Sequence, residues 1–133
     1  MRLIDFGLVV LIWLVQLVIY PSFLYYDKIA MVKWHGPYTT AITLVVMPLM
    51  VGQLILHVMS AMGQPTLWNV ITLLLVLGTW GVTFFVSVPL HNKIAAGLEL
   101  TPSIEKLIAT NWIRTILWSL VFLVTFFSQY ASD

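Results

Sequence analysis

The sequence predicts an all-α integral membrane protein, an antiparallel four-helix bundle. Hydrophobic residues make up 61% of the 133 residues and charged residues only 8%, with a mean hydropathy of +1.01. About a quarter of the residues of a soluble domain are charged. The apolar residues gather in four stretches of about twenty residues, which as helices match a hydrocarbon core of roughly 30 Å. We therefore expect one transmembrane domain over residues 1–133.

The first expected span covers residues 3–20. Its apolar run is longer than the hydrophobic region of a signal peptide, and no small-residue cleavage pattern follows it, so we expect it to be retained. Asp5, Gln16 and Tyr20 fall on one face of this helix. Pro21 lacks a backbone N–H and disfavours helical angles at the residue before it, so the span is expected to end there.

A short interfacial segment is expected between the first and second spans, over residues 22–35, because charged residues are mixed with aromatic ones there. The second span, residues 38–61, contains no charged residue, and Gln53 and His57 lie one helical turn apart on it. His35 lies five turns before Gln53. All three side chains therefore face one space if the helix continues back that far.

The third span, residues 67–90, follows a turn marked by Gly and Pro. Thr and Ser recur along it at every fourth position, a stripe that is typical of close packing or of bonds to backbone carbonyls. The fourth span, residues 106–128, follows a polar connection, and either Thr101 or Ser103 is its expected N-cap.

The basic residues predict the orientation. The lysines and Arg114 lie near one end of the expected bundle, whereas the other end carries Arg2. Lys and Arg are enriched in cytoplasmic loops, so the connections 21–38 and 91–106 are expected in the cytoplasm and both termini on the opposite side. The predicted location is the inner (cytoplasmic) membrane.

His35 and His91 are the candidate catalytic residues and metal ligands. Both are predicted at the cytoplasmic end, and polar groups inside a membrane bundle are functional candidates because they are costly unless partnered. Imidazole titrates near neutral pH and is a common ligand of haem, copper, zinc and iron, so the cofactor is left open between a metal and a haem. The further residues expected to bind a cofactor or ligand are Tyr20, Tyr38, Gln53, His57, Asn92, Asn111 and Arg114.

Each of these residues also has a plainer interpretation. The two histidines are equally suited to an interface, bonded to lipid head groups, water or carbonyls. Gln53 and His57 suit an interhelical hydrogen bond. Arg114 either snorkels to the cytoplasmic interface or turns inward to bind an anion or an acidic side chain. The acidic candidates are Asp27, Glu99 and Glu105.

The sequence excludes several function classes. It has no cysteine, which excludes disulfides, thiolate metal sites and covalent haem attachment, and its net charge of +1 with no basic tract argues against nucleic acid. No Glu-x-x-His, HExxH, GxSxG, P-loop or GxGxxG motif occurs, which excludes carboxylate di-iron sites and the standard metalloproteases, serine hydrolases and nucleotide enzymes. Ion-driven carriers generally need an intramembrane carboxylate, and Asp5, the one candidate, lies close to the end of its span.

Short motifs carry a resemblance to known membrane proteins: Tyr20-Pro21-Ser22-Phe23, Trp34-His35-x-x-Tyr38, Pro48-x-Met50-x-x-Gln53 and Asn111-Trp112-x-Arg114-Thr115-x-x-Trp118. Over most of its length the chain resembles a group of small uncharacterised bacterial four-helix integral membrane proteins. That group is distantly similar in layout to the anthrone oxygenase-like membrane family. The resemblance implies a polar pocket near one face of the inner membrane, acting on a hydrophobic or quinone-like compound with oxygen. It implies no catalytic residues beyond the motif positions.

Three functional hypotheses follow. The first is a His-containing pocket near the cytoplasmic face that binds a metal, a haem or a small hydrophobic ligand, with oxidoreductase-like chemistry. The second is non-catalytic: a structural or assembly subunit, or a homo-oligomeric pore or transport protein. The third is a carrier of a lipid-like or sterol-like ligand. The sequence leaves open whether the protein is an enzyme, and its expected partners are the lipid bilayer and a small hydrophobic ligand.

Overall fold

The structure, a computed structural model, describes residues 1–131, and within that range it is helical and contains no strand. Four segments, Arg2–Tyr25, Lys28–Gly63, Leu67–Ala95 and Leu100–Ser128, are long and apolar enough to cross a membrane. The all-α prediction is confirmed. Four such segments indicate a multi-pass membrane protein.

The segments are built as follows. The first comprises α1 (Arg2–Leu14), a π-helical turn η1 (Val15–Ile19), α2 (Tyr20–Ser22) and a 3₁₀ turn η2 (Phe23–Tyr25). The second is one helix, α3 (Lys28–Gly63). The third comprises α4 (Leu67–Val82), a π-helical turn η3 (Thr83–Ser87) and α5 (Val88–Ala95), and the fourth is α6 (Leu100–Ser128).

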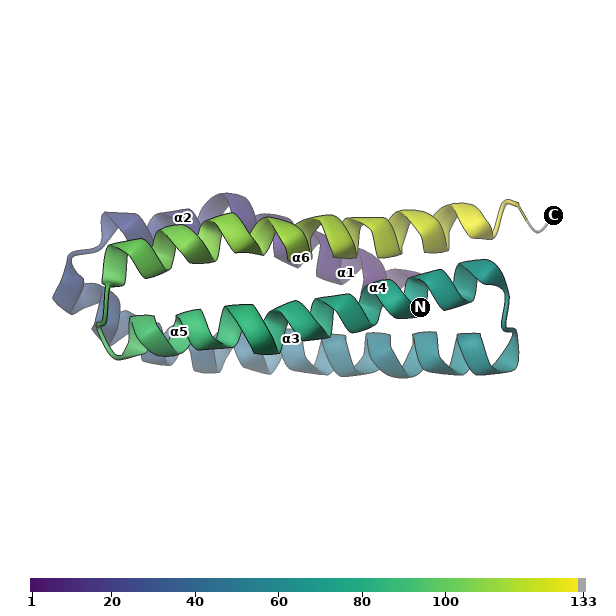
Figure 1. Cartoon of the computed structure of the whole chain (residues 1–133), viewed down its shortest axis with the longest axis horizontal. Coiled ribbons are helices and arrows are strands. Elements are labelled where there is room, and N and C mark those ends of the chain that lie inside the picture. Colours follow the sequence, from purple (N-terminus) through teal and green to yellow (C-terminus); the bar gives the residue numbers. More distant parts are fainter. Residues whose placement is uncertain (132–133) are drawn as a thin grey trace.

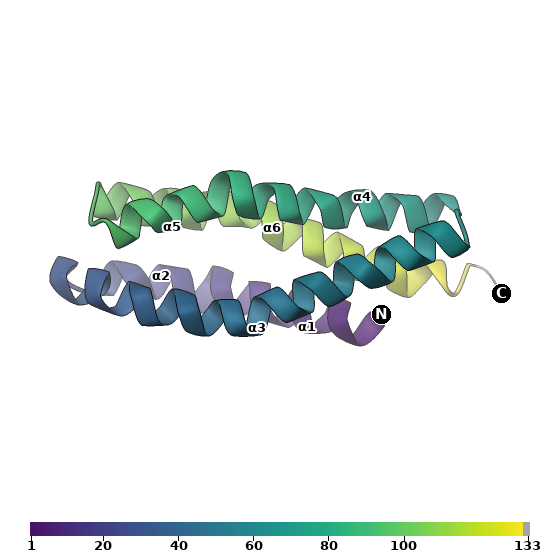
Figure 2. The same cartoon turned by 90° about the horizontal axis from the view of Figure 1, so that it is seen from below.

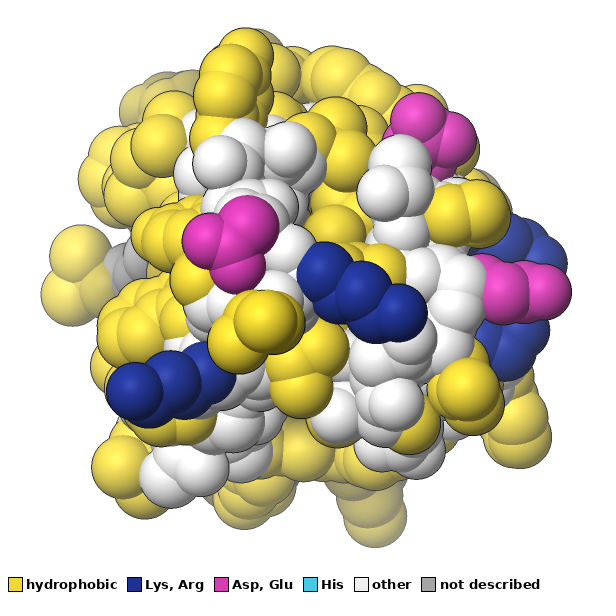
Figure 3. Space-filling view, turned by 90° about the vertical axis from the view of Figure 1, so that its left-hand side faces the viewer, with side chains coloured by type: hydrophobic (Ala, Val, Ile, Leu, Met, Phe, Trp, Pro, Cys, Tyr) yellow, Lys and Arg dark blue, Asp and Glu magenta, His cyan; other side chains and the backbone are white. Residues whose placement is uncertain are grey.

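The four segments lie along the longest axis of the molecule (Figures 1 and 2). α1 contacts α3 and α6, and α4 also contacts α3 and α6, so the segments surround a shared interior. One end, which carries the connections 26–27 and 96–99, is called the basic end because Lys28, Lys93 and Lys106 lie there. Acidic side chains lie among them (Figure 3). The other end, with the 64–66 turn, is called the far end.

Each π-helical turn precedes a proline and explains how a span passes it. In η1 the N–H of Tyr20 donates to the carbonyl of Val15, five residues back, and η3 closes in the same way before Pro89. The proline ring crowds the carbonyl four residues earlier, and the wider π turn gives it room. Tyr20 keeps helical angles of φ −64° and ψ −45°. The expectation that the first span ends before Pro21 is therefore wrong.

α3 begins earlier than expected. Most of residues 22–35, expected to form an interfacial segment, belong to this helix, which starts at Lys28 and continues through Pro37 and Pro48. Asp27 caps it, since its Oδ1 accepts a hydrogen bond from the N–H of Ala30 at 2.8 Å. This continuity puts the three polar side chains expected on one face of α3 on its buried side.

The connection before α6 is also shorter than expected. α5 ends in a turn at Gly97, whose φ of +68° suits glycine, and the N–H of Leu98 donates to the carbonyl of Lys93. α6 then begins at Leu100 without a side-chain cap. The predicted caps, Thr101 and Ser103, are therefore wrong. The earlier start moves every residue of α6 further from the helix end than the sequence suggested.

The interior combines apolar packing with many buried polar side chains. Its apolar core includes Leu8, Ile12, Met50, Leu107 and Trp118. Its buried polar residues include Asp5, Gln16, His35, Gln53, His57, Asn111 and Arg114. The outward faces are apolar instead, with large hydrophobic side chains exposed along all four segments. Polar groups inside and apolar groups outside suit a chain surrounded by lipid.

Packing between the helices is tested by comparing two leucines of α6. Leu107 is fully buried, whereas Leu120 is 41% exposed. Leu107→Ala is expected to lower the free energy of unfolding by about 2 kcal/mol or more, because it leaves an unfilled space. Leu120→Ala is expected to cost much less, because lipid or detergent fills the gap. Equal losses for the two variants in denaturant titrations of the purified protein would contradict this packing.

Candidate functional site

The far half of the interior contains a carboxylate cluster, formed by Asp5, Gln53, His57 and Trp118. The amide of Gln53 donates to Asp5 Oδ1 at 2.8 Å, and His57 Nε2 lies 3.0 Å from the same oxygen. The indole N–H of Trp118 donates to Gln53 Oε1 at 3.0 Å. All four side chains are buried. The cluster therefore joins α1, α3 and α6 through hydrogen bonds.

An amide cluster, formed by Gln16, Asn111 and Thr115, lies between α6 and the π turn η1. Gln16 Oε1 accepts hydrogen bonds from Asn111 Nδ2 at 2.9 Å and from the Thr115 hydroxyl at 3.0 Å. Its Nε2 donates to the carbonyl of Ile108 at 3.1 Å. Both ends of the Gln16 amide are thus satisfied, as a buried amide requires.

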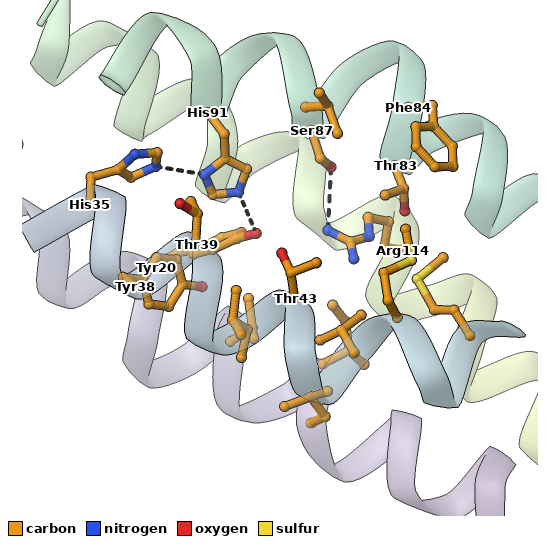
Figure 4. A pocket seen from close by; sticks show the side chains of 18 of the residues that line it. Tyr20, His35, Tyr38, Thr39, Thr43, Thr83, Phe84, Ser87, His91 and Arg114 are labelled. Carbon is orange, nitrogen blue, oxygen red and sulfur yellow. Dashed lines mark hydrogen bonds between the residues drawn. The ribbon is translucent and has the colours of Figure 1, made fainter. Parts of the chain in front are cut away.

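A histidine chain, formed by His35, His91 and Tyr20, lies toward the basic end (Figure 4). His35 Nε2 and His91 Nδ1 are 2.8 Å apart, and His91 Nε2 is 3.0 Å from the Tyr20 hydroxyl. The three residues come from α3, α5 and α2, so the chain joins three segments. Within residues 1–131, His35 Nδ1 is buried without a hydrogen-bond partner. The two histidines, which the sequence predicts to converge at this end, are thus within hydrogen-bond distance of each other.

A cavity of about 300 Å³ lies beside the histidine chain. Its polar lining includes Tyr20, His35, Ser87, His91 and Arg114. Its apolar lining comes mostly from α1 and α3 and includes Leu11, Ile12, Val15, Ile42, Val46, Met47 and Met50. On α3 the lining extends from His35 to Met50, roughly 22 Å at the rise of an α-helix. The cavity is therefore long, and its lining combines polar and apolar side chains.

The cavity opens sideways between α3 and the η3–α5 part of the third segment. The lining residues on these two edges include Thr43, Phe84, Val88 and Asn92, all of which are exposed. The residues on its inner wall, such as Met50, are fully buried. Because the exposed edge lies along the apolar flank of the molecule, the opening faces the surroundings of the helices.

Arg114 lies in the middle of α6, roughly 20 Å from either end of the helix. Its side chain is 7% exposed and lines the cavity. Nη1 donates to Ser87 Oγ at 3.3 Å, and the guanidinium carbon lies 5.0 Å from the centre of the Trp118 ring. The prediction that Arg114 belongs to the basic end is wrong, because α6 starts earlier than expected, and its burial contradicts the snorkelling interpretation.

The inward interpretation of Arg114 is correct, but its expected acidic partners are not. Within the described part of the chain, the ion pair that the structure contains joins Asp5 to His57 at 3.0 Å. It involves none of the expected acidic partners, Asp27, Glu99 and Glu105. The described residues that line the cavity also include no Asp or Glu.

The structure divides the predicted site residues between the three groups. The cavity gathers His35, His91, Tyr20, Tyr38, Asn92 and Arg114. Gln53 and His57 belong to the carboxylate cluster, and Asn111 belongs to the amide cluster. The buried face of α3 therefore serves two separate sites. The catalytic and binding roles of these residues stay predictions.

The donor set for a metal is small. The facing nitrogens of His35 and His91 are 2.8 Å apart, a hydrogen-bond distance, whereas a bound zinc ion lies about 2 Å from each imidazole nitrogen and between them. No group of three or more His, Cys, Asp or Glu side chains suited to a metal gathers within residues 1–131. Metal or haem binding by the pair stays a prediction, and this arrangement supports a hydrogen-bonded pair instead.

Several interior residues lie outside the site that was predicted from the sequence. Asp5 was set aside because it lies near the end of its span, yet it accepts the hydrogen bonds of the carboxylate cluster. Gln16 shares a face with Asp5 and Tyr20, and Ser87 belongs to the stripe on the third span. These patterns were visible, whereas the pairing of Trp118 with Gln53 across two helices had no local signal.

The carboxylate cluster predicts a non-additive pair of mutations. Asp5→Ala leaves buried donors of Gln53 and His57 without an acceptor and is expected to cost about 2 kcal/mol or more of unfolding free energy. His57→Ala in the Asp5→Ala background is expected to cost less than in the wild type, because its partner is already gone. Denaturant titrations of the single and double variants check this, with exposed Glu105→Ala as the control. Additive losses would show that the pair is not coupled.

Comparisons of the chain with protein-family models, with curated proteins and with solved structures find no match. The function of the cavity is therefore inferred from its own geometry.

Proposed function

We propose that the protein is an antiparallel four-helix bundle of the inner membrane whose cavity binds a small hydrophobic ligand with a polar head. The histidine chain serves as the acid–base group at that head. The observation that carries the proposal is a sideways-opening cavity that is lined by many apolar side chains together with several hydrogen-bonding ones.

The bundle and its orientation are supported by the distribution of charge. Lys28, Lys33, Lys93 and Lys106 lie toward the basic end, whereas Arg2 lies toward the far end. Removing Arg114 from the count leaves this asymmetry intact. Basic residues are retained on the cytoplasmic side, so the basic end is in the cytoplasm, and both termini are on the opposite side.

The orientation predicts which introduced cysteines are accessible from outside. The chain has no cysteine, so each single variant carries one thiol. In cells whose outer membrane or wall has been permeabilised while the inner membrane stays intact, Gln64→Cys at the far end is expected to react with a membrane-impermeant maleimide. Glu99→Cys at the basic end is expected to react only after the inner membrane is broken. The reverse pattern would show that the orientation is inverted.

The shape of the cavity suits a hydrophobic ligand with a small head. Binding sites for small molecules usually have volumes of roughly 300–1,000 Å³ and are mostly apolar with a few convergent polar groups. The cavity lies at the lower limit of that range. Its opening along the apolar flank allows a ligand dissolved in the bilayer to enter without passing through water.

The histidine chain can transfer a proton in either direction. In one direction Tyr20 donates to His91, which donates to His35. In the other, His35 donates to His91, which donates to Tyr20, and the Tyr20 hydroxyl is free to donate to a ligand. When a ligand gives a proton to the Tyr20 oxygen, the Tyr20 proton passes to His91 and the His91 proton passes to His35, which becomes the imidazolium. The opposite sequence returns the proton to the ligand. This supports the acid–base role in an oxidoreductase-like reaction.

Ligand binding is tested with a photoactivatable hexadecanol that carries a diazirine on its chain. Cross-links are expected to concentrate on the cavity-lining part of α3, and Met47→Trp is expected to reduce them by filling the cavity. Ile55→Trp is the control, because Ile55 lies on the same helix but faces outward with 52% exposure. Cross-links spread evenly over lipid-facing residues in all three proteins, mapped by mass spectrometry, would contradict the proposal.

The metal and haem predictions are checked by an optical spectrum and elemental analysis of the purified protein. A stoichiometric metal or haem that is lost in both His35→Ala and His91→Ala would replace the small-ligand proposal with a cofactor site.

A further inference from the structure

We infer that the ligand head is an oxyanion, a carboxylate or a phosphate, and that Arg114 binds it. The inference rests on the proposed function, because it names the chemical class of ligand for the same cavity. The observation behind it is a buried guanidinium in a cavity whose lining, among residues 1–131, includes no Asp, Glu, Lys or other Arg.

Arg114 is a buried cation. An arginine at the centre of a membrane helix is costly and almost always has a partner. Its hydrogen-bond acceptors are neutral: Ser87 Oγ at 3.3 Å and Asn111 Oδ1 at 3.5 Å. The hydroxyl of Tyr20, which also interacts with the guanidinium, brings no formal negative charge either. The carboxylate of Asp5 is taken up by Gln53 and His57 in the neighbouring cluster. A positive charge without a nearby counter-charge favours an anion in the cavity beside it.

The guanidinium of Arg114 uses one of its edges more than the other. The hydrogen bonds to Ser87 and Asn111 both use Nη1, and the Tyr20 hydroxyl also interacts with the guanidinium. Within the described residues, Nε is buried without a partner. Nε and Nη2 form the side edge of the guanidinium, which binds the two oxygens of a carboxylate or phosphate in a bidentate manner. The edge suited to an oxyanion is thus the one that the protein leaves at least half unused.

Neighbouring side chains hold Arg114 in place. The ring of Trp118 lies against the guanidinium, and Trp118 is itself tied to Gln53. Asn111 is held by Gln16, so its oxygen faces Arg114. Neighbours that are themselves hydrogen-bonded keep the arginine pointing into the cavity and do not neutralise it.

Further polar groups line the cavity near Arg114. Figure 4 shows the hydroxyls of Tyr20 and Thr43 turned toward the same part of the cavity as the Arg114 guanidinium, and all three line it. When the histidine chain donates toward Tyr20, the Tyr20 hydroxyl also donates into the cavity. Several donors and no acid describe a site for an anionic head, and the apolar lining from α1 and α3 accommodates its chain. A neutral quinone head would leave the guanidinium uncompensated.

The test compares three probes with the same sixteen-carbon chain. Palmitate, hexadecyl phosphate and hexadecanol are bound to the purified protein in nanodiscs of zwitterionic lipid, in buffer alkaline enough to ionise palmitate. At least one anion is expected to bind about tenfold more tightly than hexadecanol, since hydrogen bonds to charged groups contribute about that factor or more. Preference for palmitate identifies a fatty-acid-like ligand, and preference for hexadecyl phosphate identifies a lipid phosphate.

Two variants locate the effect. Arg114→Gln is expected to abolish the preference while hexadecanol still binds, and Arg114→Lys is expected to keep part of it because the charge remains. Lys106→Gln, an exposed cation on the same helix, is the control and keeps the full preference. Should Arg114→Gln fail to fold, the selectivity of the wild type and of Arg114→Lys still decides the question.

The outcomes separate the two proposals. Equal binding of all three probes to the wild type would overturn the anion site and leave the small-ligand proposal standing. An anion preference that survives in folded Arg114→Gln would overturn the role of Arg114. Failure of all three probes to bind would overturn both.

Discussion

A polar group inside the hydrocarbon region finds no water, so it needs a partner from the protein, and the rest of this structure depends on that constraint. The carboxylate cluster, the amide cluster and the histidine chain meet most of this need by joining side chains from different helices. Within the described residues, the Nδ1 atoms of His35 and His57 are buried without a partner. Lipid provides little hydrophobic force between helices, so packing and these bonds hold the spans in register. Arg114 differs from these groups because it is a buried cation whose surroundings orient it without neutralising it. The constraint therefore identifies what stabilises the fold, and it is the basis for the proposed anion site at Arg114.

Local sequence patterns predicted the helices and much of the interior. Long apolar runs predicted four long apolar helical segments, although the segments extend beyond the predicted bounds. Helical spacing placed Asp5, Gln16 and Tyr20 on one face, and all three are buried. The convergence of His35 and His91 also followed from the order of the spans. What could not be predicted was which polar residues pair across helices. That choice depends on the vertical offset of one helix against another, which no local pattern encodes.

The position of Arg114 shows how such an error arises. Its depth was counted from a helix start at residue 106, but α6 begins at Leu100, and the difference of more than a turn moves the residue from the interface to the centre. The prolines misled in a similar way. Pro21 was expected to stop a helix, but η1 absorbs it, and η3 does the same before Pro89. These two wider turns lie beside Tyr20 and include Ser87, and π turns are often found at functional sites.

If the proposed ligand binds in the cavity, the sideways opening between α3 and α5 affects how the cavity is filled. A compound that arrives through the bilayer is first concentrated there by its own partitioning, at about 0.8 kcal/mol for each buried methylene. If the proposed ligand reaches the cavity in this way, the protein would need only to distinguish one dissolved amphiphile from its many neighbours, and a modest intrinsic affinity would suffice to fill the site. Chain length would govern how much reaches the helices, whereas head-group chemistry would govern what stays. The dissociation constant of the proposed ligand would accordingly be best expressed as a mole fraction of membrane lipid.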